Sequence, residues 1–192
     1  MLPGLWPAWP LLRQDPTVLA DPGKYLLHHS GFVACVLLAT VLALTPLRIL
    51  FPHSRVALAL NRHRRTIGVS AFAYAVIHLT FQFLHESGWP TFFVDMRKPF
   101  LLSGMGAFII LAALAATSFN AAVRWLGGRR WKNLHRLAYV AAGLAAYHQA
   151  AARKLFPVQV LWIFVPLAAL EVARMIKKAL PAPPLHDSRR GS

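Results

Sequence analysis

Long stretches without Asp, Glu, Lys or Arg constrain this 192-residue chain more than any other feature of its sequence. A helix needs about 20 apolar residues to cross the hydrocarbon core of a bilayer. None of the stretches alternates between apolar and polar residues, as the strands of a membrane barrel do. Three stretches are long enough by themselves, and two more are long enough with their flanks: 25–47, 66–85, 99–123, 137–152 and 155–170. The sequence therefore predicts an all-α integral membrane protein, a bundle of five transmembrane helices.

The two ends of the chain differ from this central part. Residues 1–20 begin with a short apolar segment that prolines interrupt, and it is too short to span a bilayer. We interpret it as the remnant of a helix or as an interfacial anchor. Residues 181–192 are rich in proline and then polar, which is typical of a disordered tail. The domain that matters for function is therefore expected to cover residues 21–180.

The basic residues indicate how the chain is oriented. The sequence has 21 Lys and Arg against 6 Asp and Glu, a formal net charge of +15. In a soluble protein this excess would suggest nucleic acid as a partner, but here the basic residues lie between the apolar stretches. Loops 48–65 and 124–136 and the C-terminal end hold most of them. The positive-inside rule then predicts a multi-pass membrane protein with a cytoplasmic C-terminus, and no nucleic-acid partner.

Two of the nine histidines, His78 and His148, lie deep within predicted helices. Both helices are expected to run outward, so they are parallel, and the two residues lie about 20–25 Å from the inner end at 1.5 Å per residue. Ionisable residues at such a depth indicate function. Paired neutral imidazoles are typical axial ligands of a haem that transfers electrons, and small residues such as Ala75 and Ala145 leave room for it. The competing interpretation is a pair of histidines that hydrogen-bond neighbouring helices.

His135 leaves two interpretations open. It precedes His148 by 13 residues, which places it about 20 Å nearer the cytoplasm, where it could bind a second haem. On an ideal helix, however, the two rings point about 140° apart, so a bulge at Gly143 would have to correct the phase. The nearest histidine on the opposite helix is His63. The other interpretation is an interfacial histidine among basic residues and Trp131.

An ordered set of residues between about 21 and 178 carries a resemblance to a known family. The set consists of Thr45-Pro46-Leu47-Arg48, Arg64-Arg65 with Gly68, His78-Leu79, Lys98-Pro99 with Gly104, Thr117-Ser118, Arg130-Trp131, Leu134-His135-Arg136-Leu137, Tyr139 and His148. In this order it resembles MsrQ (YedZ), the haem-binding membrane subunits of the periplasmic methionine sulfoxide reductase system, in the ferric-reductase-like transmembrane group. One departure is that family members usually have a full first helix, whereas only the short segment 1–12 stands in its place here. Either the start site is misplaced, or this member has five spans and an outer-side anchor.

The resemblance implies a function and a set of cofactors. It implies that His78, His135 and His148 are ligands of one or two haems of type b, and that FMN is also bound, although the residues themselves indicate no FMN site. Electrons would come from the quinone pool or from a cytoplasmic flavin reductase. They would pass to a periplasmic molybdopterin-containing subunit that reduces methionine sulfoxide in oxidised proteins. The chain would then be an electron-transfer subunit with no catalytic residues of its own.

Two other classes of function stay open at this point. The chain could be a self-sufficient membrane reductase of quinones or metals, or a haem-free transporter or assembly protein whose buried histidines serve protons or packing. A haem stain of the purified protein separates the last class from the others. A neighbouring gene for an exported molybdopterin protein separates a dedicated subunit from a self-sufficient reductase.

Overall fold

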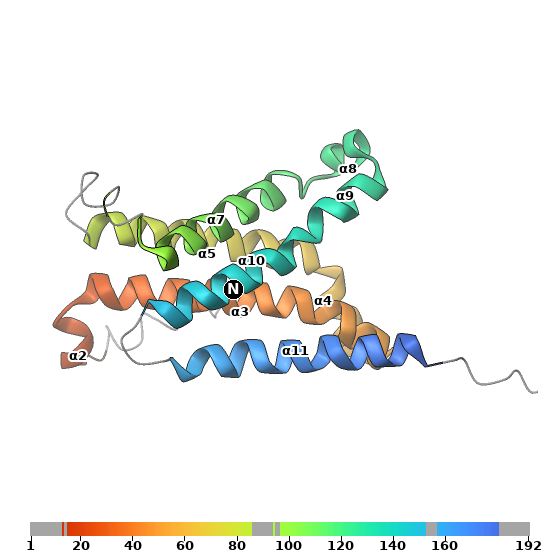
Figure 1. Ribbon diagram of the computed structural model, residues 1–192, viewed down its shortest axis with the longest axis horizontal. Helices are drawn as coiled ribbons and strands as arrows, with labels where there is room; N and C mark the ends of the chain where they lie inside the picture. Colours follow the sequence, from red (N-terminus) through yellow and green to blue (C-terminus); the bar gives the residue numbers. More distant parts are fainter. Residues whose placement is uncertain (1–12, 14, 86–93, 95–96, 153–156, 181–192) are drawn as a thin grey trace, which may run out of the picture.

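The structure is a computed structural model that describes residues 13, 15–85, 94, 97–152 and 157–180. All regular secondary structure in these residues is helical (Figure 1). The helices are α2 (Pro16–Leu19), α3 (Pro22–Leu50), α4 (Arg55–Arg62), α5 (Arg64–His85), α7 (Pro99–Ala116), α8 (Asn120–Leu126), α9 (Gly128–His135), α10 (Leu137–Ala151) and α11 (Val158–Ala179).

Four of these helices, α3, α5, α7 and α11, are long and apolar enough to cross a membrane. They correspond to four of the five predicted spans. The fifth, α10, has 15 residues and is too short to qualify alone, so the count of five spans stays a prediction. The predicted span 99–123 is too long, because α7 ends at Ala116 and Asn120 begins a separate helix.

The long helices form a bundle around α3 (Figure 1). Helix α3 packs most extensively against α5, and α11 also lies along α3. Helix α7 packs against α10. Figure 1 also shows that α5 and α10 run in the same direction, opposite to α3, α7 and α11. The predicted parallel arrangement of the two helices that carry the deep histidines is therefore confirmed.

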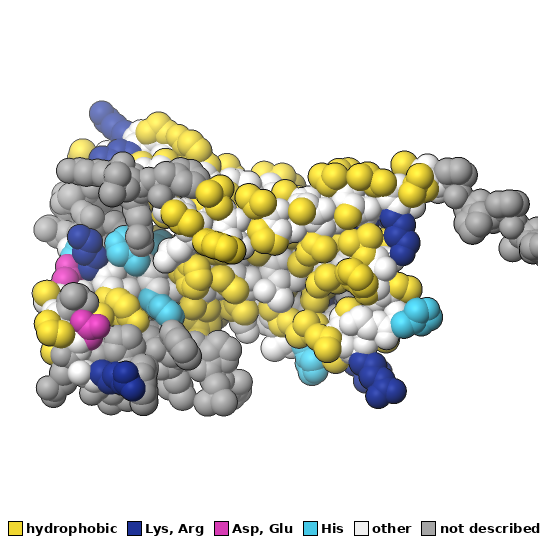
Figure 2. Space-filling model, turned by 90° about the horizontal axis from the view of Figure 1, so that it is seen from below, with side chains coloured by type: hydrophobic (Ala, Val, Ile, Leu, Met, Phe, Trp, Pro, Cys, Tyr) yellow, Lys and Arg dark blue, Asp and Glu magenta, His cyan; other side chains and the backbone are white. Residues whose placement is uncertain are grey.

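Small residues bring the helices of the bundle together. Ala71 of α5 and Ala141 of α10 are both fully buried, next to leucines such as Leu42 and Leu111. Alanine at such contacts lets two helix backbones approach closely, which is how helices pack in the absence of a hydrophobic driving force. Figure 2 shows hydrophobic side chains along the middle of one face, with Lys and Arg toward its two ends. This distribution is the one that a bilayer requires.

Local interactions fix where the helices that carry the site begin. The side chain of Asp21 accepts a hydrogen bond from the backbone N–H of Lys24 at 2.9 Å and so caps α3, whose first residue is Pro22. Pro99 similarly opens α7 directly after Lys98. These two N-termini lie at the same end of the bundle as the C-terminal ends of α5 and α10 (Figure 1). The functional site lies near this end.

Candidate functional site

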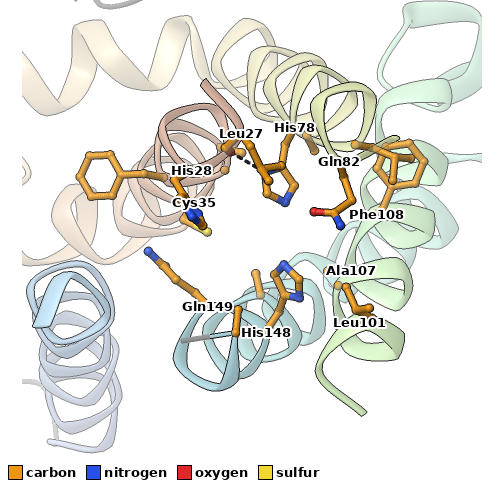
Figure 3. A pocket seen from close by; sticks show the side chains of 18 of the residues that line it. Leu27, His28, Cys35, His78, Gln82, Leu101, Ala107, Phe108, His148 and Gln149 are labelled. Atoms are coloured by element: carbon orange, nitrogen blue, oxygen red, sulfur yellow. Dashed lines mark hydrogen bonds between the residues drawn. The ribbon is translucent and has the colours of Figure 1, made fainter. Parts of the chain in front are cut away.

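A cavity of about 410 Å³ lies between α3, α5, α7 and α10. His78 of α5 and His148 of α10 are both half-buried and both line it. Figure 3 shows the two imidazoles directed into the cavity from opposite sides. Their ring centroids are 6.0 Å apart and their planes are nearly perpendicular, at 84°. The structure therefore brings together the two histidines whose equal depth the sequence predicted.

Both imidazoles are held in the same tautomer. The Nδ1 atom of His78 lies 2.8 Å from the carbonyl oxygen of Leu27, and the Nδ1 atom of His148 lies 2.7 Å from that of Phe100. A carbonyl oxygen can only accept, so each Nδ1 carries the hydrogen and donates it. In a neutral ring this leaves the lone pair on Nε2. In metal sites, a histidine ligand is oriented by the same kind of hydrogen bond, which the ring nitrogen that does not bind the metal donates.

Glycine makes this arrangement possible on both sides of the cavity. A Cβ atom at Gly31 would lie 2.8 Å from Nδ1 of His78, and one at Gly104 would lie 2.6 Å from Nδ1 of His148. Real Cβ atoms do not come this close to another heavy atom. Each imidazole therefore packs directly against the backbone of the opposite helix, close enough to reach a carbonyl oxygen four residues earlier in that helix.

Each glycine belongs to a short motif that occurs twice. Leu27-x-x-Ser30-Gly31 lies in α3, and Phe100-x-x-Ser103-Gly104 lies in α7. Both serines are buried, and each donates its hydroxyl to the carbonyl that also accepts from the histidine, at 3.1 Å for Ser30 and 2.7 Å for Ser103. The sequence analysis did not find these residues. The repeated spacing, once before each deep histidine, is the signal that could have revealed them.

The geometry fits a metal ion between the two rings. Since a metal–imidazole bond is about 2 Å long and the ring centre lies about 1 Å behind the nitrogen, two imidazoles that share one ion have centroids about 6 Å apart. The observed separation is 6.0 Å. No group of three or more His, Cys, Asp and Glu that could hold a bare ion occurs among the described residues. Two protein ligands therefore fit an ion whose remaining ligands come from a bound macrocycle.

The walls of the cavity also fit a flat, mostly apolar group. Small and apolar side chains surround the space between the rings, and Figure 3 shows several of them. They are Ala34, Leu38, Ala75, Ala107, Phe108, Leu111 and Ala145. Ala75 and Ala145, the small residues that the sequence analysis singled out, both line the cavity.

His135 lies outside this cavity, at the end of α9. Its ring stacks on Trp131, with centroids 4.0 Å apart, and its Nε2 atom lies 3.3 Å from the hydroxyl of Thr117. Burial lowers the pKa of His135 below its usual 6.5, and the positive charges of Arg64 and Arg65 lower it further. The ring is therefore neutral at pH 7, as a metal ligand must be.

Gly143, which could have hosted a bulge that corrects the phase, does not interrupt its helix. Helix α10 continues through Gly143, and the interruption lies at Arg136 instead, between α9 and α10. The flank 131–136, with which the fourth stretch could reach the length of a span, therefore belongs mostly to a separate helix. His63, the nearest candidate partner by sequence, is exposed at the end of α4.

Comparison with known proteins identifies the family of the chain. The family model of the ferric reductase like transmembrane component matches residues 30–146. Together with the four apolar helices, this match defines a multi-pass membrane protein of the ferric-reductase-like transmembrane class. Curated relatives called protein-methionine-sulfoxide reductase heme-binding subunit MsrQ narrow the class further. The chain belongs to the MsrQ family, as the resemblance predicted.

The relatives cover different shares of the chain. The protein of Polaromonas naphthalenivorans is 39% identical over 132 residues, 67% of this chain and 58% of that protein. The protein of Rhizobium meliloti is 38% identical over 181 residues, 92% of this chain and 80% of that protein. The protein of Brucella ovis is 33% identical, with 93% of this chain and 86% of that protein covered. The match with the first of these spans less than two thirds of the relative's length. No solved structure matches the chain.

Proposed function

We propose that this chain binds a haem of type b between His78 and His148 and carries electrons through the membrane. The observation that carries the proposal is the pair of imidazoles with centroids 6.0 Å apart, each bound through Nδ1 to a backbone carbonyl. In this tautomer both Nε2 atoms keep a lone pair, and the centroid separation suits two rings that share one iron ion. When bound, the haem supplies a one-electron carrier.

The residues of the chain would give this carrier a defined environment. His78 and His148 would each supply one nitrogen ligand to the haem iron, and transfer of electrons is the function that ligation by two imidazoles suits. The carbonyls of Leu27 and Phe100 would keep the two rings oriented toward the haem. The apolar wall around Phe108 and Leu111 keeps water away.

The relatives named above are described as heme-binding subunits of a protein-methionine-sulfoxide reductase. We infer the same role here: a subunit of residues 21–180 that passes electrons to a periplasmic molybdopterin-containing partner, which repairs oxidised proteins. The cavity reaches the end of the bundle at which α3 and α7 begin, since Lys24 and Lys98 line it. The basic loops 48–65 and 124–136 lie at the other end of the bundle (Figure 1). With those loops and the C-terminus in the cytoplasm, the cavity is near the outer face of the inner membrane, where the partner would dock.

The cytoplasmic half would receive the electrons. The quinone pool or a flavin reductase is the proposed donor, and FMN is a proposed second cofactor on the family resemblance alone. His135, neutral and half-buried at the inner end, is the proposed ligand of a second haem. Its separation from His78 and His148 supports two separate haem sites and argues against a single site with three histidines.

The experiment is a reduced-minus-oxidised optical spectrum of the full chain, purified in detergent after expression with ample haem. Wild type is expected to show the bands of a b-type haem, and His78→Ala and His148→Ala are each expected to abolish or strongly diminish them. His53→Ala, in the exposed loop after α3, is the matched control and should leave the bands unchanged. A wild-type protein without haem would overturn the proposal and favour a haem-free transporter or assembly protein.

A further inference from the structure

The lining of the cavity changes character along its length. On the inner side of His78 and His148 the lining is apolar, with Leu38, Ala107 and Leu111 among its residues. On the outer side, toward the N-termini of α3 and α7, the lining is polar and cationic. This cationic end consists of Lys24, His28, Gln82, His85, Lys98 and Gln149. The cavity is therefore amphipathic, and it suits a ligand that is apolar at one end and charged at the other.

The two lysines lie just above the level of the histidines. The carbonyls of Leu27 and Phe100, which accept from the histidines, mark that level on α3 and α7. Lys24 precedes Leu27 by three residues, or about 4.5 Å along the helix. Lys98 precedes Phe100 by two residues. A flexible four-carbon stem lets each ammonium group reach down to the edge of a group bound between the imidazoles.

The charges at this end are suited to an anion. None of the described residues that line the cavity is Asp or Glu. The nearby carboxylate of Asp21 is directed to the backbone N–H of Lys24 and to His85, whose Nε2 atom is 3.8 Å away. One further polar group is incomplete, since Oε1 of Gln149 is buried without a hydrogen-bond partner. Because the two ends of an amide are interchangeable, Gln149 can also present its N–H groups.

We propose that the cationic end binds the two propionate carboxylates of the haem, with Lys24 and Lys98 as their counter-ions. This inference rests on the proposed function. Charged carboxylates turned toward Leu38 and Leu111 would be buried without partners, which costs far more than the paired arrangement. The lysines therefore fix which way round the macrocycle enters, with its carboxylates toward the outer face and its apolar edge inward.

The test compares haem release from the full chain in detergent. Three proteins are loaded with haem: wild type, the double variant Lys24→Gln/Lys98→Gln and the double variant Lys24→Arg/Lys98→Arg. The release of haem to an excess of apomyoglobin is followed optically. Arg129→Gln/Arg130→Gln removes the same charge from exposed positions on α9 and is the matched control. Every protein is also loaded with haem dimethyl ester, in which the two carboxylates carry no charge.

The glutamine variant is expected to release haem about tenfold faster than wild type, because charge-assisted contacts to both carboxylates are lost. The arginine variant and the control should release haem at about the wild-type rate. With the dimethyl ester, the wild type and the glutamine variant should not differ. Equal release of ordinary haem, or the same acceleration with the ester, would overturn the proposal. Failure of the proposed function is distinguishable, since wild type would then bind neither compound.

Discussion

Gly104 lies so close to His148 that a Cβ atom at this position would be 2.6 Å from the imidazole Nδ1. The close approach allows that Nδ1 to donate to the carbonyl of Phe100, one turn earlier in the same helix as the glycine. Gly31 has the same relationship with His78, at 2.8 Å. The tautomer of each histidine is thus decided by the absence of a side chain on the opposite helix.

Gly104→Ala is expected to disturb the site although it removes no ligand. The added methyl group must displace the ring of His148, which breaks its hydrogen bond to Phe100 and moves Nε2 away from the cavity axis. We expect the haem content to fall at least about tenfold, as for other changes that disturb the support of a metal ligand. The haem content is measured as the haem absorbance per mole of purified protein.

The control for this variant is Gly143→Ala. Gly143 lies in α10, the helix of His148, and a Cβ atom there meets nothing within 4 Å. Alanine is also the better helix former, so this variant should keep both its haem and its stability. If Gly104→Ala retained haem as well as Gly143→Ala does, the close approach would not be what orients the imidazole.

The spans and the paired histidines could be predicted from the sequence because both depend on position along a helix. The depths of His78 and His148 follow from counting residues, and α5 and α10 are parallel as the basic loops indicated. The supporting residues Gly31 and Gly104 were missed because a glycine in an apolar helix does not differ in hydropathy or charge from its neighbours. Its importance arises only when another helix packs on it.

The ends of two helices were missed for a related reason. The expected span 99–123 stops early, at Ala116, where Thr117 and Ser118 donate their hydroxyls to the carbonyls of Ala113 and Leu114. The interruption at Arg136 contains neither Gly nor Pro. Close to it, the indole N–H of Trp131 donates to the carbonyl of Thr117 at 2.9 Å and so ties α9 to the end of α7. A prediction from hydropathy takes none of these contacts into account, so it could not place the two helix ends.

His135→Ala tests the proposed second haem. The variant is expected to lose one of two haems per chain and to keep the haem between His78 and His148, because His135 lies outside their cavity. A pyridine haemochrome assay against protein concentration gives the number of haems. His63→Ala, an exposed histidine near the same end, shows whether His63 is the second ligand. An unchanged haem content in His135→Ala would restrict the chain to one haem.

A polar cluster near the inner end of α10 and α11 makes a prediction about stability. The hydroxyl of Tyr139 donates to Glu171 at 3.0 Å, and Arg174 forms an ion pair with Glu171 at 2.6 Å. Arg174→Leu leaves a mostly buried carboxylate without its cation, so it should destabilise the chain more than the double variant Glu171→Leu/Arg174→Leu does.

Thermal unfolding in detergent measures this coupling. A double-mutant cycle is expected to give about 1 kcal/mol for the pair of Glu171 and Arg174, because both side chains are largely shielded from solvent. The control is Lys178→Leu, an exposed cation in the same helix. Additive effects of the two single substitutions would mean that the ion pair contributes nothing to stability.

Lys177 joins the last turns of α11 and α3. Its ammonium group donates to the carbonyl oxygens of Ile49 at 2.8 Å and Leu50 at 3.3 Å, two of the carbonyls that the end of α3 leaves without helical partners. A cation there is also favoured by the helix dipole. Because the side chain is exposed and screened by solvent, Lys177→Met should cost only about 0.5–1 kcal/mol and lower the unfolding temperature by about 1–4 °C. Lys178→Met removes the neighbouring charge without this contact, so an equal decrease in both variants would contradict a specific role for Lys177.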